Sequence, residues 1–197
     1  MNKLLRVYKF YKASFLLILL HELYYSLVDR FKFNIEPKGE IGLIPPIPTP
    51  YYYLHIARRF IKNNNIKSLI DIGSGTGRAL NFFAKINNIK LVGIEISEYS
   101  YNYSIKNSNN KIKYFKRAFE YNKFDIFECY FMADTLREEK FFSFIKHLKI
   151  SQKKDKKIYF FYINGYHWKK LTNDSKLECI YNNYNIHNRG IGIFKIK

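Results

Sequence analysis

The most informative part of the sequence is Ser-Leu-Ile-Asp-Ile-Gly-Ser-Gly-Thr-Gly-Arg, from Ser68 to Arg78. Its first five residues form a short apolar run that ends at a turn signal, which predicts a buried strand. The residues after the glycines predict a helix over 77–86. Glycines at alternate positions permit a tight turn and let a ligand approach the backbone closely. Such a turn, at the carboxyl end of a strand, is where open α/β sheets bind ligands.

The spacing of these glycines distinguishes among nucleotide ligands. A dinucleotide fingerprint has a third glycine three residues after the second, and here Arg78 occupies that position. A P-loop ends in Gly-Lys followed by Ser or Thr, and the turn lacks that sequence. Neither NAD nor ATP is therefore favoured as the ligand.

A second motif, Leu-Val-Gly-Ile-Glu-Ile-Ser, runs from Leu91 to Ser97. Its glutamate, Glu95, ends the strand predicted over 90–95 and lies 18 residues after Gly77. A carboxylate at the end of the second strand can accept hydrogen bonds from both hydroxyls of a ribose. Together with the glycine turn, Glu95 predicts a site for a ligand that contains a nucleoside.

The rest of the chain alternates predicted strands and helices, which favours a parallel sheet with helices on both faces. We expect an α/β fold with a Rossmann-like doubly wound sheet of about seven strands. The sheet is expected to be mostly parallel, with a C-terminal antiparallel strand, and an N-terminal helix precedes it. The further strands are predicted at 112–115, 124–128, 157–163, 177–181 and 191–195, and the further helices at 97–106, with Ser97 as its N-cap, and 134–148. Before the first strand, Thr49-Pro50 is typical of an N-cap followed by proline at the first helical position. It predicts a helix over about 50–62 that faces inward with Tyr53, Leu54, Ala57 and Ile61.

These motifs resemble those of the class I, Rossmann-like S-adenosylmethionine-dependent methyltransferases, over about residues 48–197. The chain looks closest to a poorly characterised bacterial group with Pro-Thr-Pro before the glycine motif, here Pro48–Pro50. That group also has a Tyr-Asn-Pro-Phe-like stretch after strand four and a Tyr-Val-Asn-Pro-like stretch at the end of strand five. The counterparts here are Glu128–Phe131, in which Cys129 and Tyr130 replace Asn-Pro, and Tyr162–Gly165.

The resemblance implies S-adenosyl-L-methionine as the cofactor and assigns its contacts. The glycine motif would hold the methionine part, Glu95 the ribose, and the stretch after strand three the adenine. Phe119 in that stretch either stacks on the adenine or belongs to the core. The end of strand four, from Glu128 to Phe131, would face the methyl group. The expected cofactor-binding residues are Asp71, Gly73, Ser74, Gly75, Gly77, Glu95, Ala118, Phe119 and Glu128.

Methyl transfer requires a donor and an acceptor held close and in line, with water excluded. A general base is needed only when the acceptor must lose a proton. Glu128, His55 and His167 are the candidates, and each also fits a structural role. The Asn-Pro-Pro-Tyr/Phe signature of enzymes that methylate amides and exocyclic amines is absent, which disfavours adenine N6 and glutamine as acceptors.

The N-terminal part, 1–47, is expected to be a helix and a connector that precede a methyltransferase domain over 48–197. The helix is predicted from Asn2 to about Arg30, and its apolar run from Phe15 to Leu20 is too short to span a bilayer. No cleavage site for a signal peptide is clear. The helix either packs on the domain or lies on an anionic membrane, where its basic residues would help. We expect a cytoplasmic protein, with the inner face of the membrane as the alternative.

The net charge of +18 comes from 34 Lys and Arg against 16 Asp and Glu. It is spread along the whole chain, and Lys outnumbers Arg 26 to 8, a profile that A/T-rich codons produce without selection for a partner. Cys129 and Cys179 provide neither a disulfide framework nor a zinc motif.

The acceptor stays open between a protein side chain and an envelope glycan or lipid. The charge favours a neutral or anionic acceptor over a histone-like one. An RNA-binding protein or RNA methyltransferase that uses the basic surface is the alternative, and so is a methyltransferase fold that has lost catalysis.

Overall fold

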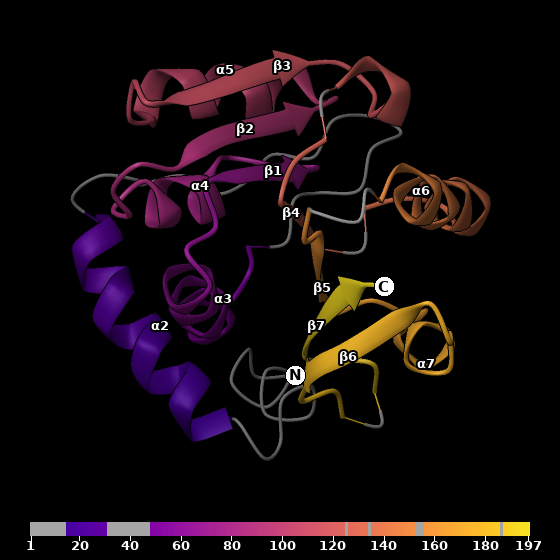
Figure 1. The fold of residues 1–197 in the computed structure, drawn as a ribbon. Coiled ribbons are helices and arrows are strands. Elements are labelled where there is room, and N and C mark those ends of the chain that lie inside the picture. The colour runs from indigo at the N-terminus through magenta and orange to yellow at the C-terminus, as the bar shows by residue number, and fades with distance from the viewer. Residues whose placement is uncertain (1–14, 31–47, 125, 134, 153–155, 186) are drawn as a thin grey trace.

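The structure is a computed structural model that describes residues 15–30, 48–124, 126–133, 135–152, 156–185 and 187–197. Its sheet has seven strands in the order β3-β2-β1-β4-β5-β7-β6 (Figure 1). β7 is antiparallel to both of its neighbours, and the other pairs are parallel. This confirms the expected α/β architecture. The strands are β1 (Ser68–Ile72), β2 (Lys90–Glu95), β3 (Ile112–Lys116), β4 (Cys129–Met132), β5 (Tyr159–Ile163), β6 (Leu177–Asn182) and β7 (Ile191–Ile196).

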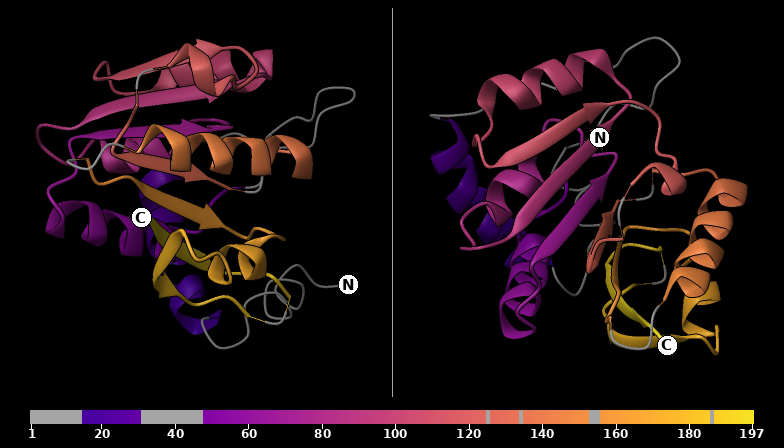
Figure 2. Two further views of the ribbon diagram at one scale, coloured as in Figure 1. Left: turned by 45° about the vertical axis from the view of Figure 1, so that its right-hand side comes forward. Right: turned by 45° about the horizontal axis from the view of Figure 1, so that its top comes forward.

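Helices cover both faces of the sheet, as Figures 1 and 2 show. On one face lie α2 (Phe15–Arg30), α3 (Tyr51–Asn63) and α4 (Arg78–Phe83), and on the other lie α6 (Glu138–Ser151) and α7 (Trp168–Thr172). α5 (Glu98–Asn107) packs along β2 and β3, and a short 3-10 helix, η2 (Tyr121–Lys123), lies between β3 and β4.

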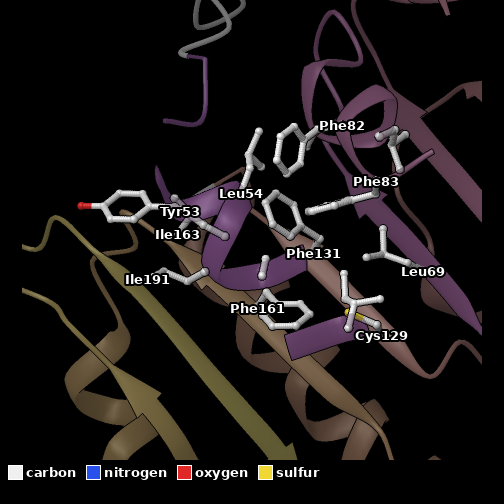
Figure 3. Packing of buried hydrophobic residues seen from close by; sticks show 14 of the residues in the cluster. Tyr53, Leu54, Leu69, Phe82, Phe83, Cys129, Phe131, Phe161, Ile163 and Ile191 are labelled. Carbon is white, nitrogen blue, oxygen red and sulfur yellow. The ribbon is translucent and has the colours of Figure 1, made fainter. Parts of the chain in front are cut away.

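Alternation of side chains along the strands divides the core into two layers. Leu69 of β1 and Phe131 of β4 face α3 and α4, whereas Ile70 and Met132 face α6. In the first layer, Phe82 and Phe83 of α4 point toward Phe131, beside residues of α3 (Figure 3). Because both faces are covered, the four interior parallel strands, β2, β1, β4 and β5, are buried along nearly their whole length.

The parallel register brings the carboxyl ends of β2, β1 and β4 to one edge of the sheet. Ile72 pairs with Ile94 on one side and with Met132 on the other. β5 continues this edge because it runs parallel to β4. The turns after β1, β2, β4 and β5 therefore share the edge at which open α/β sheets bind ligands.

The predicted fourth strand over 124–128 is wrong, because β4 begins at Cys129. Cys129 pairs with Leu69 of β1. The earlier aromatic residues pack outside the sheet: the Phe124 ring contacts that of Phe115 at 5.6 Å, and the Phe127 N–H donates to the Tyr130 hydroxyl. The chain has two adjacent apolar runs, 124–128 and Cys129–Met132, and only the second pairs with β1.

The start of α3 also differs from the prediction. Thr49 was expected to cap the helix with Pro50 as its first residue, but Pro50 stands at the cap position and no side chain of the segment caps the end. Instead Glu22 of α2 accepts the Tyr51 N–H at 2.6 Å. The residues predicted to face inward are all buried: Tyr53, Leu54, Ala57 and Ile61.

α2 packs on α3 through one side, where Ile18 is buried and the Tyr25 ring stacks on that of Tyr51 at 4.2 Å. Leu23, farther along the same helix, is exposed. The first half of the predicted helix, 2–14, lies outside the described residues. Within the part of the chain that the structure describes, no helix is long and apolar enough to cross a membrane.

Candidate functional site

The turn after β1 has a backbone that only glycine adopts readily. Gly73, Gly75 and Gly77 have φ values of 75°, 53° and 82°, in the left-handed region. The N–H groups of Gly73 and Ser74 both donate to the Ile94 carbonyl of β2, at 2.9 and 3.0 Å. The turn is therefore bonded to the end of the neighbouring strand, and its backbone is fixed.

The turn after β4 packs directly against the glycine turn. Thr135 donates from Oγ1 to the Ile72 carbonyl at 3.0 Å. A Cβ added at Gly73 would collide with the Thr135 side chain. Gly73 is thus required both for its backbone conformation and for this close approach.

Glu95 ends β2, as the sequence predicts, and it is buried. Its Oε2 accepts the Gly75 N–H at 2.7 Å, and its Oε1 accepts the N–H groups of Ile96 and Ser97 at 2.9 and 2.8 Å. A carboxylate has about four acceptor positions, so these three bonds leave one for a ligand hydroxyl. A second hydroxyl would have to replace the bond from Gly75.

Asp71 lies in β1, two residues before Gly73, and its side chain is buried. Burial, and to a lesser extent the charge of Glu95, raises the pKa of Asp71 to about 8. The carboxyl group therefore holds its proton near neutral pH. A ligand that brings a positive charge to this side chain would favour its ionised form, because opposite charges stabilise each other at low dielectric.

Ser74 supplies a direct sign that the turn is built for a ligand. Its hydroxyl oxygen is buried and has no hydrogen-bond partner among the described residues. Buried hydroxyls are nearly always satisfied, so an orphaned one in a glycine turn indicates a ligand contact. The residues present therefore fit a cofactor with polar groups at the glycine turn and a ribose near Glu95.

The expected adenine contacts are placed less favourably. Ala118 is exposed after β3, but the Phe119 ring packs on Phe124 and, at 5.2 Å, on Phe144 of α6. Phe119 thus takes the core role that the sequence left open. Ile96, which the sequence did not single out, is 56% exposed between the buried Glu95 and Ser97. The signal in the sequence that could have indicated Ile96 is an isoleucine between two polar residues, Glu95 and Ser97, directly after the predicted strand.

Glu128 is not at the site, so its two predicted roles are wrong. It precedes β4 at the amino edge of the sheet, where its Oε2 accepts the Lys67 N–H at 2.7 Å and its own N–H donates to Ser68. The predicted methyl-facing stretch fails for the same reason: Cys129–Phe131 lies buried within β4. The residues at the carboxyl end of β4 are Ala133, Thr135 and Leu136, together with position 134, which lies outside the described residues.

The two histidine candidates lie apart. His55 of α3 is enclosed between α2 and α4, where its Nε2 bonds to the Tyr25 hydroxyl at 2.9 Å and its ring contacts Phe82. Burial, and then the neighbouring His21, lowers the pKa of His55. His167 follows β5 at the carboxyl edge, and its ring contacts Phe141 at 5.3 Å. Of the three candidates, His167 alone lies at the edge that carries the glycine turn.

The turn after β5 is held rigidly. Asn164 adopts a φ of 52°, and both its N–H and its side-chain oxygen bond to Gly190 before β7, at 2.9 and 3.1 Å. The Gly165 N–H donates to the Tyr184 hydroxyl, which itself donates to the Tyr162 carbonyl at 2.7 Å. Tyr166, the next residue of this turn, is 61% exposed at the carboxyl edge of the sheet.

The arrangement of glycine turn, Glu95 and switch in strand order between β1 and β4 defines an open α/β nucleotide-binding fold. No family model matches the sequence, and no curated protein is significantly similar to it. Solved structures identify the type of fold. A Staphylococcus aureus protein described as a caffeoyl-CoA O-methyltransferase is 16% identical, with a TM-score of 0.59, over 90% of this chain and 99% of its own.

The N-terminal domain of human METTL16, solved in complex with S-adenosylhomocysteine, is 16% identical, with a TM-score of 0.53, over 90% of this chain and 80% of its own. The chain spans about half, 51%, of the plantazolicin methyltransferase BpumL, which matches 62% of this chain at 21% identity and a TM-score of 0.48. The protein has the Rossmann-like fold of the class I methyltransferases.

Proposed function

We propose that the protein is an S-adenosyl-L-methionine-dependent methyltransferase. The observation that carries the proposal is the glycine turn after β1, bonded to Ile94 and to the buried carboxylate of Glu95. Asp71, Gly73, Ser74, Gly75 and Gly77 would hold the methionine part of the cofactor, and Glu95 its ribose. The solved structure of a similar fold with S-adenosylhomocysteine supports S-adenosyl-L-methionine as the cofactor.

Ile96 is proposed as a contact of the nucleoside, together with Ala118. Its exposed apolar side chain directly follows Glu95, so it stands beside the place where the ribose would bind. An adenine ring presents an apolar face that such a side chain can cover. Phe119 is not proposed, because its ring is already packed in the core.

The cofactor would supply a methyl group bound to a positively charged sulfur, and this methyl group would be transferred in line to a nucleophile. The residues of this chain would bind the donor, orient it and exclude water. The turn after β4 lies against the glycine turn through Thr135, so the acceptor would approach between the turns after β4 and β5. His167 is the remaining candidate for a base, and it would act only if the acceptor carries a proton.

The acceptor is proposed to be neutral or anionic, because a protein with a net charge of +18 repels a basic partner. A protein side chain and an envelope glycan or lipid both remain acceptors of this kind. An RNA acceptor is the alternative, and it predicts binding that weakens steeply as salt rises.

A thermal-shift panel tests the cofactor. S-adenosylmethionine and S-adenosylhomocysteine should raise the unfolding midpoint of the full chain, because a ligand that binds only the folded state stabilises it. NAD and ATP should not, since the turn lacks both of their motifs. A shift with NAD or ATP, and none with the two methionine derivatives, would overturn the proposal.

A further inference from the structure

A carboxylate of the N-terminal helix α2 reaches the end of the glycine turn. Glu22 accepts a hydrogen bond through Oε2 from Nη1 of Arg78 at 3.1 Å. Arg78 is the first residue of α4 and directly follows Gly77, the last glycine of the turn. The glycine turn is therefore fixed at two places: by Ile94 and Glu95 of β2, and through Arg78 by α2.

The second oxygen of Glu22 holds the start of α3. Its Oε1 accepts the N–H of Tyr51, the first residue of that helix, at 2.6 Å. A negative charge at a helix N-terminus is favourable because the free N–H groups there carry partial positive charge. One carboxylate thus bonds to the amino end of α3 and to the side chain of the first residue of α4.

Aromatic contacts hold the same junction from the side. The Arg78 guanidinium lies over the Tyr51 ring, 4.6 Å from its centroid, and Tyr51 stacks on Tyr25 of α2. Nη1 of Arg78 also approaches the Thr49 carbonyl at 3.5 Å. With side chains about a third exposed, 28% for Arg78 and 34% for Glu22, the pair is protected from water in part.

The burial of Glu22 supports a role beyond surface solvation. Desolvation raises the pKa of Glu22 even though Arg78 acts in the opposite direction. Because desolvation opposes the charge of this carboxylate, its ionised form depends on the hydrogen bonds that it accepts from Arg78 and Tyr51. These bonds fix the position of Arg78 beside the glycine turn.

We propose that α2 is part of the cofactor site, with Glu22 as a positioning residue that acts through Arg78. The inference rests on the proposed function. Glu22 sets the Arg78 guanidinium and the amino end of α3 at the methionine end of the site, opposite the ribose carboxylate Glu95. The positive charge of Arg78 then stands where a ligand carboxylate would come close, and α2 belongs to the site despite its place before the domain in sequence.

Two ligands that differ only at the methionine end test the proposal. S-adenosylhomocysteine carries the amino-acid part, whereas 5′-methylthioadenosine keeps the nucleoside and the sulfur without it. Binding of both to the full chain is measured by calorimetry, well below the unfolding midpoint of each variant. Glu22→Gln should weaken S-adenosylhomocysteine about threefold to tenfold and 5′-methylthioadenosine less than twofold, because it removes one partly exposed ion pair.

The matched control is Glu178→Gln, which removes another carboxylate from another ion pair, with Lys195 at the β6 edge of the sheet. It should change neither affinity. Like Glu22→Gln, Arg78→Gln should lower the affinity for S-adenosylhomocysteine relative to the affinity for 5′-methylthioadenosine. The double variant should lower this ratio of affinities no further than Arg78→Gln alone. That pattern shows that Glu22 acts through Arg78.

The two proposals fail differently. If the unaltered protein binds both ligands and Glu22→Gln weakens both equally, or neither, the role of α2 is overturned and the proposed function stands. If additive losses replace the expected coupling, Glu22 does not act through Arg78, and the proposal is again overturned. If the unaltered protein binds neither ligand, the proposed function is contradicted and the inference falls with it.

Discussion

The turn after β1 and the turns after β4 and β5 lie at one edge of the sheet, but different parts of the chain hold them. The glycine turn is bonded to the end of β2, through the Ile94 carbonyl and the buried carboxylate of Glu95. The turn after β4 is held by the Thr135 side chain, and the turn after β5 is held by Tyr184 and by the bonds between Asn164 and Gly190. The glycine turn and Glu95, which we call the cofactor half of the site, offer polar groups for a ligand. The turns after β4 and β5, which we call the acceptor half, offer mainly aromatic and small residues.

This difference explains why the cofactor can be inferred and the acceptor cannot. A glycine turn and a carboxylate at fixed spacing are required by the shape of a nucleoside with a polar tail, so they leave a sequence pattern. The acceptor half depends on which side chains project from rigid turns, and many side chains are compatible with the same fold. Variants in the two halves should therefore separate cofactor binding from the rest.

Gly73→Ala should have the largest effect and abolish binding of S-adenosylhomocysteine. The left-handed backbone at this position costs a residue with a Cβ about 1–2 kcal/mol, and the new methyl group would collide with Thr135. Calorimetry measures the loss, and circular dichroism shows whether the fold is retained. Adding Thr135→Ala should restore part of the affinity. A folded Gly73→Ala protein that binds like the unaltered one would show that the glycine turn does not hold the cofactor.

Glu95→Gln should weaken S-adenosylhomocysteine on the order of tenfold to a hundredfold, because hydrogen bonds to a charged group contribute about 1.5–3 kcal/mol. It should also lower the unfolding midpoint, since three backbone N–H groups lose a charged acceptor. Glu98→Gln is the matched control: Glu98 lies three residues on and pairs with Lys116 at the surface. Equal losses in the two variants would show that Glu95 has no special role.

Asp71→Asn should stabilise the protein, by an amount that depends on pH. In the folded state the pKa of Asp71 is raised to about 8 from its ordinary value of 3.8, so the folded state keeps a proton that the unfolded state releases. Stability therefore falls as pH rises from about 4 to 8. Each kcal/mol recovered shifts the midpoint of a chain of this size by about 2–4 °C.

Unfolding midpoints of both proteins between pH 4 and pH 8 measure this effect. The gain from Asp71→Asn should be near zero at pH 4 and largest at pH 8. The variant should also bind the cofactor less tightly, because it cannot offer a carboxylate to a cationic group. A gain that is constant with pH would show that Asp71 ionises normally in the folded state.

Ile96→Ala and Tyr166→Ala should have the smallest effects and should differ from each other. Ile96 is proposed to cover the nucleoside, so its truncation should weaken S-adenosylhomocysteine by a few fold, as the loss of a partly buried apolar side chain predicts. Tyr166 lies in the acceptor half, so its truncation should leave this affinity unchanged. Calorimetry under the same conditions compares the two exposed residues, and the reverse order would place the nucleoside near β5.

The sequence predicted the elements around the glycine turn well because these elements are local. β1 and β2 have the predicted bounds, and Ser97 caps α5 as expected, accepting the Ser100 N–H through its side chain. Each of these depends on turn chemistry or capping over a few residues. The site at the carboxyl end of β1 follows from them directly.

The acceptor half and the start of α3 could not be predicted in the same way. The choice between 124–128 and Cys129–Met132 for β4 depends on pairing with β1 across sixty residues of chain. Because the strand was predicted too early in the chain, Glu128 was expected at the carboxyl edge of the sheet, whereas it lies at the amino edge. The capping of α3 by Glu22 is likewise a contact between distant segments, which leaves no pattern within either of them.

A calorimetric titration of the full chain with S-adenosylhomocysteine tests whether the glycine turn and Glu95 form a cofactor site. We expect one site per chain with a dissociation constant in the micromolar range, about −8 kcal/mol in binding free energy, and no heat from Gly73→Ala under the same conditions. Absence of binding by the unaltered protein at millimolar ligand would contradict the presence of this site.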